Sequence, residues 1–303
     1  MSKAKIKDLP ASIHDRLLQQ ARASGRPLNE LLQYYAIERF LYRLTYSPYA
    51  DQFVLKGALL FRVWGLPAFR PTRDIDLLGY TSNDVENLVA IVRDVCKMDV
   101  PEDGIHFDPK SVKGERIKED AEYAGVRLKF IGLLGRIRLN MQIDIGFDDV
   151  VSPAPVVKPY PVILSMPAPA LRSYPPEAVV AEKLQATIYL GSANSRMKDI
   201  YDLWMLSENI EFIGEMLQEA IRLTFEHRDT DIPENEPVAF LERFAGEKQE
   251  QWQAFLKTSA IMDAPDKFEL ILTRLREFIL PIFESLQKDM RFKKTWKADR
   301  LWK

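Results

Sequence analysis

The sequence predicts an α+β fold, in which a mixed sheet lies between an N-terminal helical segment and a C-terminal helical domain. Three observations lead to this prediction. Apolar residues recur with a helical period in the first 48 residues, in short strand-like runs up to about residue 149, and with a helical period again beyond residue 176. The chain of 303 residues has the length of about two domains. We place the domain boundaries at residues 1–48, 49–165 and 166–303.

The N-terminal segment contains two predicted helices. In the first, Ser12 is a candidate N-cap, Ile13 and Leu17 share one apolar face, and Gly25 ends the helix. The second covers residues 27–44, and its apolar side chains nearly encircle it. Because a helix that is apolar all round is usually buried, we expect this second helix to lie in the core.

In the central part of the chain, strand-like apolar runs alternate with helical segments. The predicted strands are residues 52–55, 74–78, 126–131 and 137–147. One predicted helix begins at Gly57 and ends near Gly65, and a second begins at Ser82 or Asn83. A glycine-containing turn at 132–135 joins the last two strands as an antiparallel hairpin.

A proline-rich segment separates the central part from the C-terminal helices. Residues 152–176 hold eight of the 19 prolines, so we expect an extended linker there and no packed element. Pro176 suits the first position of a helix. The helices predicted from this point onward are residues 176–191, 195–208, 211–227, 248–260 and 265–288.

Charge and cysteine content exclude several classes of protein. The 42 basic and 44 acidic side chains nearly cancel, which excludes a uniformly basic nucleic-acid binder, although residues 287–303 carry seven basic and two acidic side chains. The single cysteine, Cys96, excludes internal disulfides and a multi-cysteine zinc site. No apolar run reaches the length of about 20 residues that a membrane span needs. The N-terminus also has no apolar signal segment, so we expect a cytoplasmic protein without membrane contact.

The sharpest chemical feature is the pair Asp74 and Asp76. In a strand, residues two apart point to the same side, so Ile75 turns to the core and the two carboxylates share one face. Such a pair can hold Mg²⁺, or Mn²⁺, against triphosphate oxygens, and Asp144 on a second strand would complete the site. Gly57 and Ala58 follow a strand and leave room for phosphate against backbone N–H groups.

Taken alone, the two aspartates have a second interpretation, in which they merely solvate the end of a strand, since short D-x-D matches are common. The upstream glycine turn and Asp144 favour a functional site. Arg70 and Arg73 flank the pair and are candidates to bind phosphate or an acceptor. Both arginines are also compatible with a purely solvent-exposed surface.

Four motifs occur in order over residues 50–210. They are K-G-A-L-L at 56–60, R-x-T-x-D-I-D at 70–76, A-E-K-L at 181–184 and N-S-R-M-K-D-I-Y-D-L at 194–203. Together they resemble the AbiEii/MenT-type nucleotidyltransferase toxins, which belong to the DNA polymerase β-like nucleotidyltransferase superfamily. This resemblance implies that the mixed sheet has the nucleotidyltransferase fold. Many members have Gly, Ser or Thr at the position of Ala58, so one phosphate contact is absent here.

The resemblance also implies roles for individual residues. The expected catalytic residues are Asp74, Asp76, Lys183 and Asp199. The expected nucleotide-binding residues are Lys56, Gly57, Ala58, Arg70, Thr72 and Asp202, and the expected metal ligands are Asp74, Asp76 and Asp144. It further implies a nucleoside triphosphate (NTP) substrate, the 3′ end of tRNA as acceptor, and a toxin held in check by a cognate antitoxin protein.

Two of these regions also allow a plainer interpretation. Lys183 lies beside an apolar helix stripe, where a lysine commonly extends its ammonium past apolar surface into solvent. Asp199 and Asp202 stand three apart on one helix, which also fits a solvated face. The aromatic and basic residues of the segment 287–303 fit binding of single-stranded RNA ends, or simple docking of the last helix on the core.

Other functions remain compatible with the motifs. The nearest alternative keeps nucleotidyl transfer but uses a small molecule or a protein as acceptor. A glycosyltransferase also uses D-x-D with a divalent metal, but it needs neither Asp144 nor the A-E-K-L helix. A third class is a non-catalytic, partner-binding protein in which the site is a remnant of the fold.

Overall fold

The computed structural model describes residues 8–66, 72–119, 123–297 and 300–303. They form two compact units. Of these residues, the first unit contains 8–65, 72–119, 123–148 and 156–173, and the second contains 66, 149–155, 174–297 and 300–303. Strands and helices occur in the first unit and almost only helices in the second, which confirms the predicted α+β class.

The first unit begins with the two predicted helices, α1 (Leu9–Ser24) and α2 (Leu28–Tyr46). Asp8 caps α1 in place of the predicted Ser12, because its carboxylate accepts the Ala11 N–H at 3.0 Å. Gly25 ends α1 as predicted, with a φ of 68° that glycine adopts readily. Most side chains of α2 from its second turn onward are buried, as its apolar pattern predicts.

Seven strands form the sheet of the first unit, in the order β3-β4-β5-β2-β1-β7-β6. They are β1 (Phe53–Lys56), β2 (Asp74–Gly79), β3 (Ile105–Glu119), β4 (Tyr123–Leu134), β5 (Ile137–Gly146), β6 (Val156–Pro159) and β7 (Ala170–Ser173). The pairs β2–β5 and β1–β7 are parallel, and the other pairs are antiparallel. The sheet is therefore mixed, as predicted.

Three strands of this sheet were not predicted. The strand β3 contains Pro109 and Gly114, which interrupt its apolar pattern, and its pairing with β4 shifts register between Asp108 and Lys113. The strands β6 and β7 lie within the predicted linker, so the expectation of no packed element there is wrong. Pro159 is tolerated because β6 is an edge strand, where one side of the backbone needs no ladder partner.

The turn between β4 and β5 also differs from the prediction. The strands continue to Leu134 and Ile137, which face each other, so the connection is the two-residue turn Gly135–Arg136. Gly135 has a φ of 58°, a conformation such a turn favours. Gly132, predicted in the turn, lies in β4, where an added Cβ would be 3.1 Å from the Phe107 ring.

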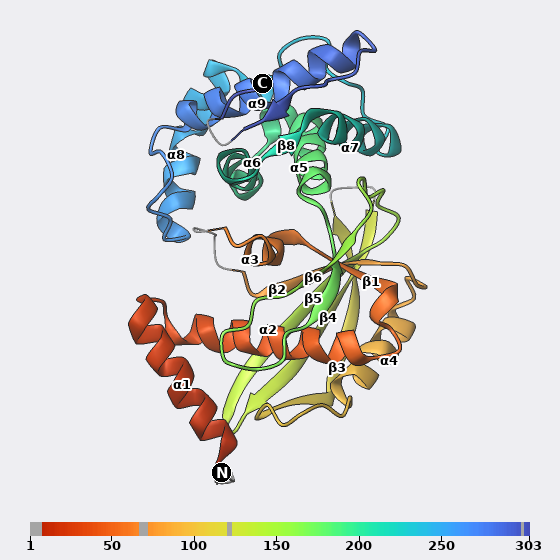
Figure 1. Cartoon of the computed structure of the whole chain (residues 1–303), viewed down its shortest axis with the longest axis vertical. Coiled ribbons are helices and arrows are strands. Elements are labelled where there is room, and N and C mark those ends of the chain that lie inside the picture. Colours follow the sequence, from red (N-terminus) through yellow and green to blue (C-terminus); the bar gives the residue numbers. More distant parts are fainter. Residues whose placement is uncertain (1–7, 67–71, 120–122, 298–299) are drawn as a thin grey trace. The chain divides into compact units, whose positions relative to one another are not determined.

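One face of the sheet is apolar and covered by helices. Along β5, buried and less buried residues alternate, and the buried set pairs with buried residues of β4. The Phe40 ring of α2 lies 5.6 Å from Phe107 and 4.9 Å from Phe130, so α2 packs on this face (Figure 1). The helix α4 (Val85–Cys96) packs on the same face, and Asp84 caps it in place of Ser82 or Asn83. The opposite face of the sheet carries the polar side chains.

The second unit is helical, as predicted. Its helices are α5 (Pro176–Leu190), α6 (Met197–Asn209), α7 (Gly214–His227), α8 (Glu242–Thr258) and α9 (Phe268–Gln287). Pro176 starts α5 as expected. The helix α6 is buried along most of its length and packs against α5, α8 and α9, so it forms the centre of this unit (Figure 1).

The end of the chain docks on the second unit through its aromatic residues. The short strand β9 (Thr295–Trp296) pairs with β8 (Phe212–Ile213). Trp296 is buried and donates its indole N–H to the Ser207 carbonyl, while Trp302 stacks on Phe278 at 5.8 Å. Of the two interpretations of this segment, the structure shows the docking of its aromatic rings.

Among the described residues, no helix combines the length and the apolar character that crossing a membrane requires. Cys96 is a buried free thiol at the end of α4, consistent with the absence of disulfides that a single cysteine dictates.

Candidate active site

The strand β2 presents Asp74 and Asp76 on the polar face of the sheet. Ile75 between them is fully buried, while both aspartates are half-buried. The period-two prediction for this strand is therefore confirmed. Because side chains alternate between the two faces of a strand, both carboxylates face away from the apolar layer.

Asp76 belongs to a row of charged side chains that crosses five strands. It lies opposite Lys56 of β1 on one side and opposite Asp144 of β5 on the other. Asp144 lies opposite Arg127 of β4, which lies opposite Glu115 of β3. Residues directly opposite one another share a face, and neighbouring strands are about 4.8 Å apart. The fold thus brings together residues from distant parts of the sequence.

Gly57 makes room for the Asp76 carboxylate. Its φ is 72°, and a Cβ added there would lie 2.0 Å from Asp76 Oδ2 and 2.6 Å from Asp76 Cγ. Any other residue at position 57 would both strain the backbone and displace the carboxylate. Whatever binds there, the glycine at position 57 is needed to accommodate the Asp76 carboxylate.

The helix predicted from Gly57 to Gly65 is shorter than expected. It consists of a 3₁₀ turn, η2 (Gly57–Leu59), and the four-residue helix α3 (Leu60–Val63). Ala58, the second residue of the 3₁₀ turn, is buried. The assignment of Lys56, Gly57 and Ala58 to nucleotide binding stays a prediction.

Asp144 is held by an arginine of the neighbouring strand. Arg127 donates from Nε to Oδ1 at 2.8 Å and from Nη2 to Oδ2 at 2.7 Å, which is the bidentate fork geometry. Gln142 adds a third hydrogen bond, from Nε2 to Asp144 Oδ2 at 3.2 Å. The side chain of Asp144 is 12% exposed, so this carboxylate is largely shielded from solvent.

Asp74, Asp76 and Asp144 were predicted to bind a metal ion. Among the described residues, no group of three His, Cys, Asp or Glu side chains is arranged to hold a metal ion. Mg²⁺, however, often binds through one or two carboxylates and completes its shell with water and substrate phosphates. Asp74 and Asp76 fit that donor set, whereas Asp144 is committed to Arg127. The role of Asp144 as a metal ligand stays a prediction.

The segment before β2 carries the remaining predicted residues of the first unit. Thr72 is half-buried, and its N–H donates to the Tyr34 hydroxyl at 3.2 Å. The exposed Arg73 offers its carbonyl to Gln33 at 3.3 Å. Arg70, predicted to bind nucleotide, lies outside the described residues.

In the second unit, the structure brings Lys183, Asp199 and Asp202 together. The Lys183 Nζ lies 2.6 Å from Asp199 Oδ1 and 2.9 Å from Asp202 Oδ2. Arg196 contacts the other oxygen of Asp199. The two aspartates are almost fully buried, so the interpretation as a solvated helix face is wrong. Lys183 is directed to these carboxylates and not past the apolar surface to solvent.

The charges of this cluster balance. Burial alone would raise the pKa of Asp199, but the Lys183 ammonium and the Arg196 guanidinium hold the pKa of that carboxyl well below its ordinary value. Two cations and two anions thus meet in a shielded place. The arrangement fixes the ammonium and the carboxylates relative to each other.

Sequence reasoning did not single out Arg127 as the partner of Asp144. The predicted turn at 132–135 would place Arg127 opposite Asn140, four residues away from Asp144. With the turn at Gly135–Arg136, the same counting places Arg127 opposite Asp144, as observed. The signal was therefore present in the sequence, but it depended on choosing the glycine that forms the turn.

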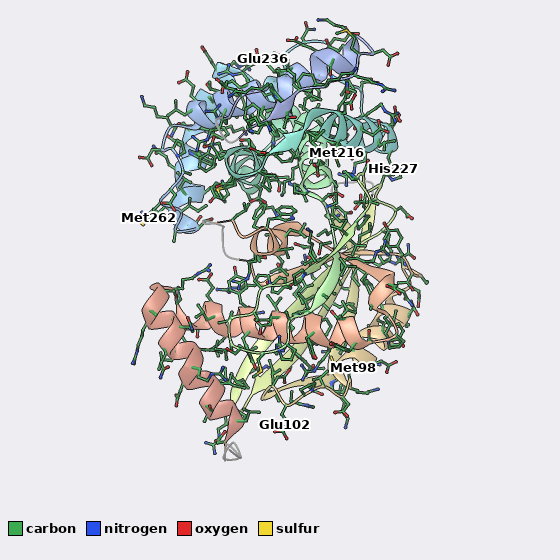
Figure 2. The ribbon with its side chains drawn as sticks, viewed as in Figure 1. Met98, Glu102, Met216, His227, Glu236 and Met262 are labelled. Atoms are coloured by element: carbon green, nitrogen blue, oxygen red, sulfur yellow. The ribbon has the colours of Figure 1, made fainter. Side chains whose placement is uncertain are left out.

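A cavity of about 520 Å³ lies elsewhere in the first unit, between the start of α1 and the loop from α4 to β3. Figure 2 labels Met98 and Glu102, which line it together with the ion pair of Arg43 and Asp103. None of the predicted site residues borders this cavity. Its charged lining residues are Asp99, Glu102 and Asp103 against the single cation Arg43, so it does not suit a phosphate.

Comparison with known proteins gives a family. The family model of the AbiEii toxin nucleotidyl transferases, from the type IV toxin–antitoxin system, matches residues 39–274. No curated protein sequence matches the chain. Among solved structures, JHP933 from Helicobacter pylori is similar, with 16% identity and a TM-score of 0.44 over 86% of this chain and 94% of that one. A candidate nucleotidyltransferase from H. pylori has 17% identity and a TM-score of 0.46 over 85% and 96%, respectively.

Proposed function

The chain belongs to the AbiEii family of nucleotidyl transferase toxins, and on that premise we propose that it transfers a nucleoside monophosphate from an NTP to an RNA end in a metal-dependent reaction. The sheet then has the nucleotidyltransferase fold that the motifs predict. The observation that supports the metal-dependent chemistry most directly is the placement of Asp74 and Asp76 side by side on the polar face, with Asp76 seated against Gly57.

In this proposal, Asp74 and Asp76 hold Mg²⁺ or Mn²⁺. The metal, when bound, neutralises phosphate oxygens of the triphosphate and polarises the reacting phosphoryl group. The protein residues position the reactants, which is the main source of rate in phosphoryl transfer. Lys56, directly opposite Asp76, offers a further positive charge on the same face.

The acceptor hydroxyl attacks the α-phosphorus, the bond to the bridging oxygen breaks, and pyrophosphate leaves. The hydroxyl proton passes to a nearby base or to water. The new phosphodiester bond joins the nucleotide to the acceptor, so the balance needs no further reactant.

An RNA acceptor, with the 3′ end of tRNA as the expected example, agrees with the surface of the C-terminal segment. Lys288, Arg291, Lys293 and Lys294 are exposed there, while the neighbouring aromatic rings are buried. Such a surface suits phosphate contacts and not base stacking, so we expect it to hold the RNA backbone. The toxin–antitoxin family also implies an antitoxin as the second partner.

The deciding experiment separates the acceptors. The full chain is incubated with each of the four α-³²P-labelled NTPs and Mg²⁺, in parallel with total RNA, total protein, or aminoglycosides as a representative small-molecule class. Label in the RNA fraction, mapped to the tRNA 3′ end, supports the proposal. Label in protein or small molecules only would replace the RNA acceptor. The absence of label in every fraction would overturn the proposed function itself.

A nucleotide-sugar donor is the remaining enzymatic alternative. The same incubation with UDP-glucose tests it, because a D-x-D glycosyltransferase would consume the sugar nucleotide and leave the NTPs intact. Each reaction is repeated in EDTA, and loss of transfer in EDTA supports the metal requirement.

A further inference from the structure

We infer that Arg127 is a binding residue for the phosphates of the nucleotide, and that Asp144 acts through it as a positioning residue. This inference rests on the proposed function, because it assigns a phosphate-binding subsite within the same face of the sheet. It is carried by the position of Arg127, by its unused donors, and by the charge around it.

The position follows from strand register. Arg127 lies on β4, two strands away from Asp76, with Asp144 of β5 between them. At about 4.8 Å per strand, the two backbones are about 10 Å apart, a separation that the long arginine side chain and a triphosphate bridge easily. The hydrogen bonds with Asp144 raise the pKa of the Arg127 guanidinium, and burial opposes this shift. The negative charge of Asp74 also raises this pKa, by a smaller amount, so Asp74 and Arg127 interact electrostatically.

The donors of Arg127 are only partly used. Asp144 accepts from Nε and from one hydrogen of Nη2. A guanidinium has five N–H donors, so three remain, and among the described residues they have no hydrogen-bond acceptor. The side chain is 33% exposed, which leaves it accessible to a ligand and yet partly desolvated. An arginine fork in that condition matches the oxygens of a phosphate group.

The charge of this face favours such a cation. In the row that contains Arg127, the negative Asp76, Asp144 and Glu115 alternate with or adjoin the positive Lys56 and Arg127, and Asp74 adds a further negative charge beside the row. A triphosphate adds further negative charge, which one divalent metal does not neutralise. A positive group fixed beside the metal ligands lowers the cost of binding the polyphosphate and of the charge that develops on the leaving pyrophosphate.

Asp144 orients the guanidinium of Arg127. Its two oxygens occupy the Nε edge of the guanidinium and fix the plane of the fork, while Gln142 fixes the carboxylate. Arg127 thereby loses less side-chain freedom when phosphate binds, because the rotamer is already set. An alternative is that the pair merely links β4 to β5, in which case substrate affinity would not depend on it.

The experiment measures binding of inorganic pyrophosphate to the full chain by calorimetry, with Mg²⁺ and in EDTA, and separately KM and kcat for the NTP. We expect Arg127→Ala to weaken pyrophosphate binding about 10-fold or more in both media, the effect of losing charged hydrogen bonds. Arg127→Lys keeps the charge but loses the fork, so it is expected to bind with intermediate affinity. The matched control is Lys129→Ala, which lies two residues along the same face and pairs with Glu115 instead.

Arg127→Ala leaves a shielded carboxylate unpaired, so the double variant Arg127→Ala/Asp144→Asn removes both charges and protects the fold. Pyrophosphate affinity equal to wild type in a folded double variant would overturn the inference. The single variant Asp144→Asn separates two roles. A positioning role raises KM for the NTP without changing the Mg²⁺ concentration needed for half-maximal rate, whereas a metal-ligand role raises that Mg²⁺ requirement and would overturn this part.

Failure of the inference is distinguishable from failure of the proposed function. If wild type transfers nucleotide and the Arg127 variants bind pyrophosphate as wild type does, the function stands and the subsite is refuted. If wild type neither binds pyrophosphate nor transfers nucleotide, the function and the subsite that rests on it are both refuted.

Discussion

The charged residues of the sheet and those of the helical unit are the same chemical types assembled in opposite ways. On the sheet, Asp74, Asp76 and Asp144 stand side by side on one face and are half-exposed or linked to a single arginine. In the helical unit, Asp199 and Asp202 are buried, and two cations balance them. The first arrangement places carboxylates on a half-buried face beside charged residues of both signs, while the second encloses two carboxylates with cations in a buried place.

From this difference we expect substitutions in the two regions to have different effects on activity and on stability. Removing Asp74 or Asp76 from the sheet removes a candidate metal ligand from a half-buried position, so activity is expected to fall while the fold survives. Removing a carboxylate from the helical cluster leaves excess positive charge in a shielded place, so stability is expected to fall first. The following predictions test that contrast, in order of decreasing effect.

Asp76→Ala should abolish NTP transfer and growth inhibition, with a rate loss of about 10²–10³-fold or more, since removing one electrostatic group at a reacting centre costs about 10²–10³-fold. The protein should still fold, because Asp76 is half-buried and the backbone pairing of β2 with β1 and β5 does not depend on its side chain. Single-turnover transfer and thermal denaturation check the two parts. Full toxicity of this variant would refute the mechanism.

Asp202→Ala should lower the free energy of unfolding by about 3–5 kcal/mol, since it removes one of the carboxylates that neutralise Lys183 in a shielded place. Urea denaturation measures this change. The matched control is Glu219→Ala in the same unit, which breaks an exposed ion pair with Arg222 and is expected to cost less than about 1 kcal/mol. Equal effects in the two variants would contradict the contrast drawn above.

Gly57→Ala should reduce transfer about 10²-fold, because the added Cβ displaces the Asp76 carboxylate and a shift of about 1 Å at a reacting centre has that effect. Gly65→Ala provides the control. Gly65 has a similar φ of 68°, but no atom lies within 4 Å of an added Cβ, so only the backbone strain remains. Equal loss of transfer in both variants would show that strain, and not the seat of Asp76, is responsible.

The two units should also respond to pH in opposite directions. Burial raises the pKa of Glu38 in α2 to about 7, although Arg39 opposes the shift. Its contribution to stability is therefore complete below the ordinary carboxyl pKa and is lost as pH rises toward 7. The pKa of Asp199 is lowered, so its contribution is complete above the ordinary value and is lost as pH falls below it.

Urea denaturation between pH 3 and 8 checks both signs, with Glu38→Gln and Asp199→Asn as the variants. Glu38→Gln should flatten the slope between about pH 4.5 and 7, and Asp199→Asn the slope below about pH 4. A slope of the reverse sign in either window would refute the corresponding assignment.

The smallest expected effect concerns the exposed lysines of the last segment. Lys293→Ala/Lys294→Ala should reduce the slope of log RNA affinity against log salt concentration by about 1–2, because two phosphate contacts are lost, with the melting temperature unchanged. Trp296→Ala is the opposite case, since the ring is buried and its loss should cost about 3–5 kcal/mol of stability. A loss of RNA affinity in folded Trp296→Ala alone would restore the interpretation as a stacking surface.

The sequence predicted those features that depend on local periodicity. The alternation in β2 placed Asp74 and Asp76 together on one face and Ile75 on the other, and the helices of the second unit followed from their apolar period. These features need no knowledge of which elements meet, because two-residue and 3.6-residue periods are properties of a single segment.

The features that depend on pairing between segments were not predictable in the same way. The pairing of Arg127 with Asp144 depends on which glycine forms a turn, and the burial of Asp199 depends on helices that pack around α6. The proline-rich stretch was predicted to be a linker. It instead contributes β6, whose position at the edge of the sheet allows it to contain Pro159. Only the resemblance to a family pointed to Lys183 and Asp199, and it did not show their mutual contact.

Because the chain passes back and forth between the two units, they cannot be separated by a single cut at an arbitrary point of the proline-rich segment. The hairpin of β6 and β7 completes the sheet, although residues 149–155 before it belong to the other unit. A recombination joint placed before Val156 would therefore remove β7 from its place beside β1 and expose the backbone of that strand to unintended pairing. A transplanted helical cassette must begin after Ser173, and a shuffling library with crossovers on either side of that hairpin would reveal this boundary as a step in the fraction of folded chimaeras.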